Sequence, residues 1–365
     1  MTEKRPPRQV VIIMTDTQRK DMLGCYGNPD MKTPNLDRLA SEGIRFERAY
    51  TCQPVCGPAR SALFTGTFPH SNGTWANSLP LGDTVKTIGQ RLHDRGIKTA
   101  YMGKWHLDGG DYFGMGRCPP GWDPEYWYDM RNYLEELSLE DRQESRSLWK
   151  SQDPDLTADF TYGHRVSNRA LQFLEKHAHE DFLLVVSYDE PHGPFVTPQP
   201  YADMYQNYNF PVSENVKDIL EDKPEHQQAW AGAVRKSDRT NVKIQFPAFF
   251  GCNSFVDAEI GRVLEKIDIY TPNSLVVYTA DHGDMLQSHC LNNKGPAMYE
   301  EITNIPFLVR WKGRVQEKQI SSQLVSHIDV VPTILDVFQI PASKVLEGNS
   351  MLPLFSQPNQ PLKDR

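Results

Sequence analysis

The sequence predicts an α/β/α sandwich, in which helices cover both faces of a large mixed sheet that is mostly parallel. Three observations support this fold class. Apolar runs typical of buried parallel strands occur at 9–16, 98–102, 181–188 and 274–279. Helical segments separate these runs, as the crossovers between parallel strands require. Polar residues follow each run, which predicts a ligand site beyond the carboxyl ends of the strands.

The elements follow one another along the chain in this order. The first strand ends in Asp16, and a capped amphipathic helix is predicted over 33–40. A second helix is predicted over 84–95, where Gly96 closes it. An apolar run at 305–309 precedes a helix-like stretch at 327–338. The alternation therefore continues through most of the chain.

Composition excludes several classes of protein. The chain has 365 residues and a net charge of −8 with histidine neutral. This balance argues against nucleic acid or an anionic membrane as partner, because either normally requires a basic surface. No stretch approaches the roughly 20 apolar residues of a membrane span, and the first apolar run is too short for a signal peptide. We therefore expect a cytoplasmic protein. Its six cysteines are too few for a disulfide framework.

We expect one large domain over residues 1–345, with insertions at about 108–159 and 196–245. Both insertions break the alternation of strands and helices, and both are suited to rim or cover a pocket. The aromatic stretch 122–133 is typical either of a ring-stacking surface for substrate or of core. Residues 346–365 are predicted to be a linker or the beginning of a truncated subdomain.

One motif indicates a specific chemistry. Residues 56–60 are Cys-Gly-Pro-Ala-Arg, and Thr-Gly follows at 65–66. This pattern closely resembles the signature of type I sulfatases, in which a maturation enzyme oxidises the cysteine to formylglycine. The resemblance covers nearly the whole chain and implies an alkaline phosphatase-like fold, nearest to the cytoplasmic branch with choline sulfatases and phosphonate monoester hydrolases. Without it, the motif is a turn with a buried cysteine, and a pair with Cys52 lacks the usual metal or redox spacing.

The resemblance implies an enzyme that hydrolyses a small-molecule sulfate ester. The aldehyde hydrate made from Cys56 carries two hydroxyls: one attacks sulfur and forms a covalent sulfated intermediate, and deprotonation of the other releases sulfate. One alternative is a phosphonate monoester or phosphodiester hydrolase on the same scaffold, because phosphoryl and sulfuryl groups share tetrahedral geometry. The other is a catalytically inactive scaffold or binding protein.

Asp16, Asp281 and His282 are the metal candidates. Two carboxylates at the ends of neighbouring buried strands need a cation to stay ionised together. Many sulfatases bind calcium through two successive aspartates at the first position and Asp-Asn at the later one. Here a threonine follows the first aspartate and a histidine the second, which shifts the preference toward manganese. We expect one divalent cation, Ca²⁺ or Mn²⁺, also held by the modified Cys56, with Gln18 as a further candidate oxygen ligand.

The helix predicted to begin at Cys56 places residue 56 near unpaired N–H groups and the positive end of the helix dipole, which suits a sulfate-like anion. Arg60, one turn further on, lies on the same face and is expected to hold the hydrate. Without the resemblance, Arg60 is an ordinary surface arginine. Asn77 is a weaker candidate ligand of the sulfate.

Four further roles follow from the resemblance. Lys104 holds the formylglycine oxygen, and His106 is the base that breaks down the intermediate. His192 and Lys294 bind the sulfate oxygens and protonate the leaving alcohol. Taken singly, each lysine is typical of a solvated surface charge and each histidine of a structural or exposed residue. All four nevertheless follow a buried strand or a Gly/Pro turn, where side chains converge.

Sulfatases usually continue beyond the segment at 346–354 into a smaller antiparallel sheet with a packed helix, which closes one side of the cleft. This sequence stops at Arg365. We therefore expect that subdomain to be missing or truncated, and the apolar patch it would leave to favour homo-oligomers.

Overall fold

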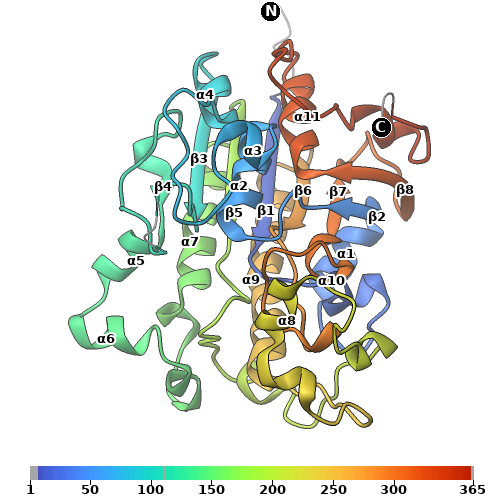
Figure 1. The fold of residues 1–365 in the computed structure, drawn as a ribbon. Coiled ribbons are helices and arrows are strands. Elements are labelled where there is room, and N and C mark those ends of the chain that lie inside the picture. The colour runs from blue at the N-terminus through green and yellow to red at the C-terminus, as the bar shows by residue number, and fades with distance from the viewer. Residues whose placement is uncertain (1–6, 110–111, 363–365) are drawn as a thin grey trace, which may run out of the picture.

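A single mixed sheet organises the molecule (Figure 1). The computed structural model describes residues 7–109 and 112–362, and within them the sheet has eight strands in the order β4-β3-β5-β1-β6-β7-β2-β8. The strands are β1 Gln9–Thr15, β2 Ile44–Tyr50, β3 Lys98–Gly103, β4 Trp127–Tyr128, β5 Phe182–Ser187, β6 Leu275–Ala280, β7 Phe307–Arg310 and β8 Gln319–Ser326. Among these strands only β7 runs opposite to its neighbours. The predicted mixed, mostly parallel sheet is confirmed.

The four apolar runs form the centre of the sheet as β1, β3, β5 and β6. Almost every residue in them is buried. Strands β2 and β8 were not predicted, because many residues of each are only partly buried or exposed and neither contains an apolar run. They pair in parallel at one side of the sheet, where β8 is the edge strand.

Helices cover both faces of the sheet. The α-helices of the described residues are α1 Pro34–Ser41, α2 Cys56–Thr65, α3 Pro69–Asn72, α4 Ile88–His93, α5 Met130–Glu136, α6 Leu139–Glu144, α7 Tyr162–Lys176, α8 Glu225–Ala231, α9 Pro247–Tyr270, α10 Glu300–Thr303, α11 Val330–Val337 and α12 Leu352–Ser356. One apolar core contains Val10 and Ile12 of β1 with residues of α2, α4, α11 and α12. The second contains Val11 and Ile13 with residues of α1, α7 and α9. Alternate side chains of β1 thus enter opposite layers, which gives the predicted α/β/α sandwich.

The helix predicted over 33–40 is α1, whereas the one predicted over 84–95 is shorter. Helix α4 begins only after Thr87, because a capping box closes its first turn. The Thr87 hydroxyl accepts the Gln90 N–H, and the Gln90 side chain accepts the Thr87 N–H at 2.9 Å. The predicted start was therefore four residues too early.

The two insertions carry helices of their own. The first contains α5 and α6, although its residues 110–111 lie outside the described residues, as do 363–365 of the final segment. Within its aromatic stretch, Trp122, Tyr128 and Tyr133 are buried, so these rings belong to the core and not to a substrate surface. The second insertion contains α8. No helix in the described parts of the chain is both long and apolar enough to cross a bilayer.

Candidate active site

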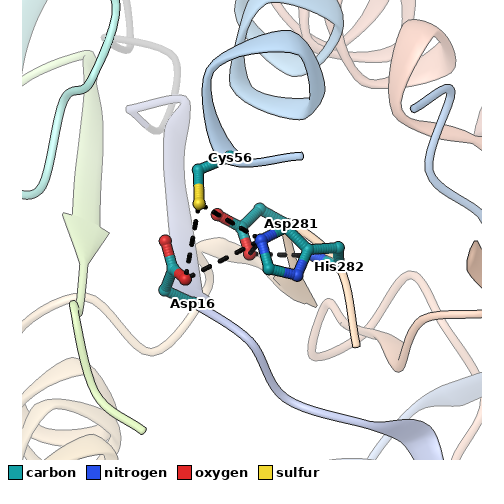
Figure 2. Close-up of side chains that lie close together, drawn as sticks. All are labelled: Asp16, Cys56, Asp281 and His282. Atoms are coloured by element: carbon teal, nitrogen blue, oxygen red, sulfur yellow. Dashed lines mark hydrogen bonds and ion pairs between the residues drawn. The ribbon is translucent and has the colours of Figure 1, made fainter. Parts of the chain in front are cut away.

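Four predicted site residues meet at the carboxyl ends of the central strands (Figure 2). Strands β1 and β6 are parallel neighbours in which Thr15 lies opposite Ala280, so the residues that follow them, Asp16 and Asp281, come side by side. Cys56 begins α2, and His282 follows Asp281. One ligand atom from each of Asp16, Cys56, Asp281 and His282 lies within 4.8 Å of the others, and all four side chains are buried.

The imidazole of His282 is oriented as metal-bound histidines are. Its Nδ1 lies 2.8 Å from the Gly283 carbonyl, so Nδ1 carries the proton and donates it. Nε2 then faces the cluster, 3.2 Å from Cys56 Sγ and 3.6 Å from Asp281 Oδ1. Burial opposes a charge on this ring, but Asp281 and Cys56 raise its pKa to about 9, so a cation in the cluster would replace the Nε2 proton. A backbone acceptor that fixes the tautomer in this way is typical of metal sites. Two carboxylates and one imidazole are a donor set that fits a divalent cation.

The charges of the chain compensate the two carboxylates unequally. Burial opposes ionisation of Asp16, yet Lys104, His192 and Arg60 hold its pKa well below the usual value. Burial and the nearby Asp16 raise the pKa of Asp281 to about 7. Ionisation of Asp281 beside an ionised Asp16 is therefore unfavourable unless a further cation is bound. The charges thus support a cation site at the same ligands.

Arg60 bridges the two carboxylates from behind. Its Nη2 and Nε lie 3.1 Å from Asp16 Oδ2 and Asp281 Oδ2, which leaves Oδ1 of each carboxylate facing the cluster. Nη1 also donates to the Ser187 hydroxyl at 2.8 Å. The guanidinium is fully buried, so the interpretation as a surface arginine is wrong. Its predicted contact with the hydrate stays a prediction.

The residue after Asp16 supports the two carboxylates. The Thr17 hydroxyl donates to Asp16 Oδ1 at 2.7 Å, and its N–H donates to Asp281 Oδ1 at 3.1 Å. Gln18 does not join the cluster, because its amide NH₂ donates to Asn253 Oδ1 at 2.6 Å and its amide oxygen accepts the Thr15 hydroxyl. The proposed extra oxygen ligand is therefore wrong for this arrangement.

Two lysines make the surroundings of Cys56 positive. Lys104 Nζ lies 2.7 Å from Asp16 Oδ2, and Lys294 Nζ lies 3.4 Å from the Thr17 hydroxyl. Burial and Asp16 oppose a thiolate, but Lys104, Lys294 and His282 lower the pKa of the Cys56 thiol to about 6. The side chain of residue 56 thus occupies a place where the chain stabilises an anion.

Gly103 lets the chain leave β3 in the direction that brings Lys104 into the site. Its φ is +122°, and a Cβ at this position would lie 1.8 Å from the Ser187 carbonyl oxygen. The same carbonyl accepts the Lys104 N–H at 2.8 Å. Only glycine permits this close approach of β3 to the end of β5.

His106 and Asn77 flank the first turn of α2. The Asn77 side-chain oxygen accepts the Gly57 N–H at 2.8 Å. His106 is buried, and its Nδ1 has no hydrogen-bond partner among the described residues. Burial and the positive charges of Lys104 and Arg60 lower the pKa of His106 to about 4, so the ring is neutral at neutral pH.

His192 is held by residues that the sequence analysis did not identify. Its Nδ1 lies 2.9 Å from the Gly193 carbonyl and 3.1 Å from the Tyr112 hydroxyl. Tyr112 also donates to Asp189, which lies 3.0 Å from Lys104 Nζ. Asp189 follows a buried strand as Asp16 does, so the same signal was present for it. Tyr112 lies in an insertion, where no local pattern marks it.

The cysteines support neither a disulfide nor a cysteine pair. All six lie in the described residues, and none of them forms a disulfide there. Cys52 Sγ lies 3.3 Å from the Ser326 hydroxyl, and Cys56 Sγ faces His282. The alternative of a metal or redox pair between Cys52 and Cys56 therefore has no support in the geometry.

Comparison with known proteins extends this description. The profile of the family described as Sulfatase matches residues 8–340. An uncharacterized sulfatase, YidJ of Escherichia coli K12, is 44% identical over 363 residues, which cover 96% of this chain and 71% of that protein. A ulvan-active sulfatase of Formosa agariphila is 28% identical, covering 98% of this chain and 66% of its own. The phosphonate monoester hydrolase of Agrobacterium radiobacter has the same fold, with a TM-score of 0.79, 21% identity, and coverage of 99% and 79%.

Proposed function

This chain belongs to the sulfatase family of hydrolases, and we propose that it cleaves a sulfate monoester with a formylglycine made from Cys56 and one divalent cation. A single observation carries the proposal. Cys56 Sγ lies among three potential metal ligands, and two lysines face the same group. The side chain of residue 56, the proposed nucleophile, thus lies next to a possible cation site and within the positive field of two lysines that would attract an anion.

The two groups that the chain would acquire supply complementary chemistry. The hydrate of formylglycine offers two hydroxyls on one carbon. Asp16, Asp281, His282 and residue 56 would hold a divalent cation, Ca²⁺ or Mn²⁺, which would favour deprotonation of a neighbouring hydroxyl. Arg60 keeps both aspartates in position for the cation, because it binds the carboxylate oxygens that face away from the cluster.

The remaining residues bind the sulfate and move protons. Lys104 holds the formylglycine oxygen and Lys294 stabilises the charge on the sulfate oxygens, since the positive charges of both lysines act on residue 56. His192 presents Nε2 to the leaving alcohol, because its Nδ1 is held by Gly193 and Tyr112. Burial and Lys104 lower the pKa of this ring, so its imidazolium form is a strong acid that donates the Nε2 proton to the alcohol. His106 is neutral at neutral pH and accepts the proton that releases sulfate.

Asn77 has a second role beside the predicted one. Its side-chain oxygen binds the Gly57 N–H and so fixes the turn that carries residue 56. The amide NH₂ on the same carbon remains for a sulfate oxygen, as the sequence analysis predicts for this residue.

A phosphonate monoester or phosphodiester hydrolase is the second candidate function. The solved phosphonate monoester hydrolase shares this fold, and the site described above suits any tetrahedral anion. The third alternative, a scaffold without activity, has to explain why so many charged groups are buried around one thiol.

The deciding experiment uses protein produced together with a formylglycine-generating enzyme. Mass spectrometry of the peptide that contains residue 56 reports the modification, and turnover is measured on an aryl sulfate and on a phosphonate monoester. Modification with sulfate release supports the proposal. Turnover of the phosphonate alone favours the second candidate, and a modified protein that hydrolyses neither ester favours the inactive scaffold.

A further inference from the structure

The loop that carries Lys294 is fixed mainly by contacts outside the sheet. It runs from Leu291 to Met298 after β6, and most of its residues are exposed or only partly buried. Among the described residues Lys294 itself makes one hydrogen bond, at 3.4 Å to the Thr17 hydroxyl. Two backbone bonds tie the loop to the chain that leaves β6: the Met285 N–H donates to the Asn293 carbonyl at 2.7 Å, and the Leu291 N–H donates to the Ser288 carbonyl at 2.9 Å. These contacts alone do not explain a defined position of the ammonium group.

Helix α8, from the second insertion, contacts this loop on both sides of Lys294. The Trp230 indole N–H donates to the Asn292 carbonyl at 3.1 Å. His226 Nε2 donates to the Pro296 carbonyl at 3.2 Å. The two acceptors lie two residues before and two residues after Lys294, so α8 holds the backbone on both sides of this lysine. In Figure 1, α8 lies at the end of the molecule toward which the parallel strands run.

Packing strengthens these two hydrogen bonds. A Cβ on Gly295 would lie 3.0 Å from atoms of the Trp230 ring, so the ring lies directly against the loop backbone next to Lys294. The Tyr299 hydroxyl donates to the Gln227 side chain at 2.6 Å and ties the end of the loop to the same helix. Beneath these contacts a small apolar cluster joins the insertion to the site loop; it contains Leu220, Ala231, Met285, Cys290, Leu291 and Ile302.

We infer that α8 is a positioning clamp for Lys294, in which Trp230 and His226 hold the flanking carbonyls and so fix where the ammonium meets the substrate sulfate. This inference rests on the proposed function, because it assigns Lys294 to sulfate binding. Trp230 is then a positioning residue, since it acts only through Lys294. The second insertion has a defined task in the reaction beyond covering the pocket.

The test is a double-mutant cycle between Trp230 and Lys294. Trp230→Phe removes the indole N–H and keeps the aromatic packing. We expect it to raise KM and lower kcat/KM about three- to tenfold, the effect of one lost hydrogen bond. In the Lys294→Ala background the same substitution should change kcat/KM less than about twofold, because the residue through which it acts is gone. An equal loss in both backgrounds would overturn the inference.

A second measurement does not depend on catalysis. Hydrogen exchange of peptides covering 291–299 should be faster in Trp230→Ala, because the loop loses its clamp. The matched control is Trp149→Phe, the same change as in the cycle at a tryptophan that is 76% exposed in the first insertion; it should alter neither kinetics nor exchange. Unchanged exchange in Trp230→Ala would show that α8 does not hold the loop. If the unsubstituted protein hydrolyses no ester, the proposed function fails, while the exchange rates still decide whether the clamp exists.

Discussion

The candidate site has two halves that are held in different ways. Asp16, Asp281 and Arg60 lie at the ends of β1 and β6 and on α2, and all three are fully buried. Lys294 and His192 lie on loops, and both depend on contacts from the insertions. Strand register places the two aspartates of the first half, and the buried helix α2 places Arg60. The second half is positioned by tertiary contacts, so its precision can be lost without unfolding the protein.

The largest expected effect is the loss of the nucleophile in the buried half. Cys56→Ala should lower kcat/KM by at least about 10³-fold, because no other side chain offers the same chemistry. Melting followed by circular dichroism should show that the protein still folds. Cys52→Ala is the matched control and should keep its activity. Substantial turnover by the Cys56 variant would contradict the assignment of the nucleophile.

Arg60 tests whether the buried half is also structural. Arg60→Met leaves two carboxylates buried without their guanidinium, which should reduce the free energy of unfolding by about 3–5 kcal/mol in urea titrations. Excess Mn²⁺ or Ca²⁺ should restore part of this loss, since a cation compensates the same charges.

The matched control for Arg60 is Arg38→Met, at a partly exposed arginine that pairs with Glu42 and Asp268. It should cost only about 0–1 kcal/mol. Equal losses in the two variants would remove the distinction between a buried and an exposed ion pair.

Lys294 is the corresponding test of the loop-held half. Lys294→Ala should lower kcat/KM about 10²-fold, the loss typical of one charge-stabilising group, with little change in the free energy of unfolding. Steady-state kinetics and urea unfolding on the same preparation measure both quantities. Lys217→Ala, at an exposed lysine that pairs with Glu214, serves as the control. A loss of stability as large as that of Arg60→Met would contradict the comparison, because both halves of the site would then contribute equally to folding.

The thiol of the unmodified protein reports the positive surroundings of residue 56. After chelation, Cys56 should titrate with a pKa of about 6, so thiolate exceeds thiol about tenfold at pH 7. The native pKa lies below the unfolded value. The resulting stabilisation is therefore present at high pH and disappears as the pH falls through 6. Thiolate absorbance of the wild type minus Cys56→Ser measures the titration, and a midpoint near 9 would contradict it.

The smallest expected effect concerns Tyr112. Tyr112→Phe removes the hydroxyl between Asp189 and His192, which should lower kcat about three- to fivefold and leave the free energy of unfolding nearly unchanged. Kinetics with an aryl sulfate measure this change. Tyr50→Phe, which removes a surface hydrogen bond to Glu300, is the control. An unchanged kcat would show that the Tyr112 hydroxyl is not needed to orient His192.

The same division explains what the sequence could predict. Asp16 and Asp281 were found because each follows a continuous apolar run, a local signal that also identified the central strands. Cys56 was found through a short motif. The roles of Thr17 and Gln18 were harder to predict, because the backbone conformation after β1 decides which of the two faces the carboxylates.

Residues outside those signals could not be found from the sequence. Tyr112 and Trp230 lie in insertions without periodicity, and their contacts join segments 62 residues or more apart along the chain. Strands β2 and β8 were missed for a related reason. Both strands are partly exposed. Their strand conformation depends on pairing and packing with residues distant in sequence, and their composition alone does not indicate it.

Gly103 has a consequence for how relatives of this enzyme are judged. A single methyl group at that residue would push β3 away from the end of β5, because the Ser187 carbonyl already occupies the space. Lys104 would then be displaced, although every proposed catalytic side chain is still encoded. A relative can therefore possess the complete set of motif residues and still be inactive. Surveys that infer activity from those residues alone would misclassify it.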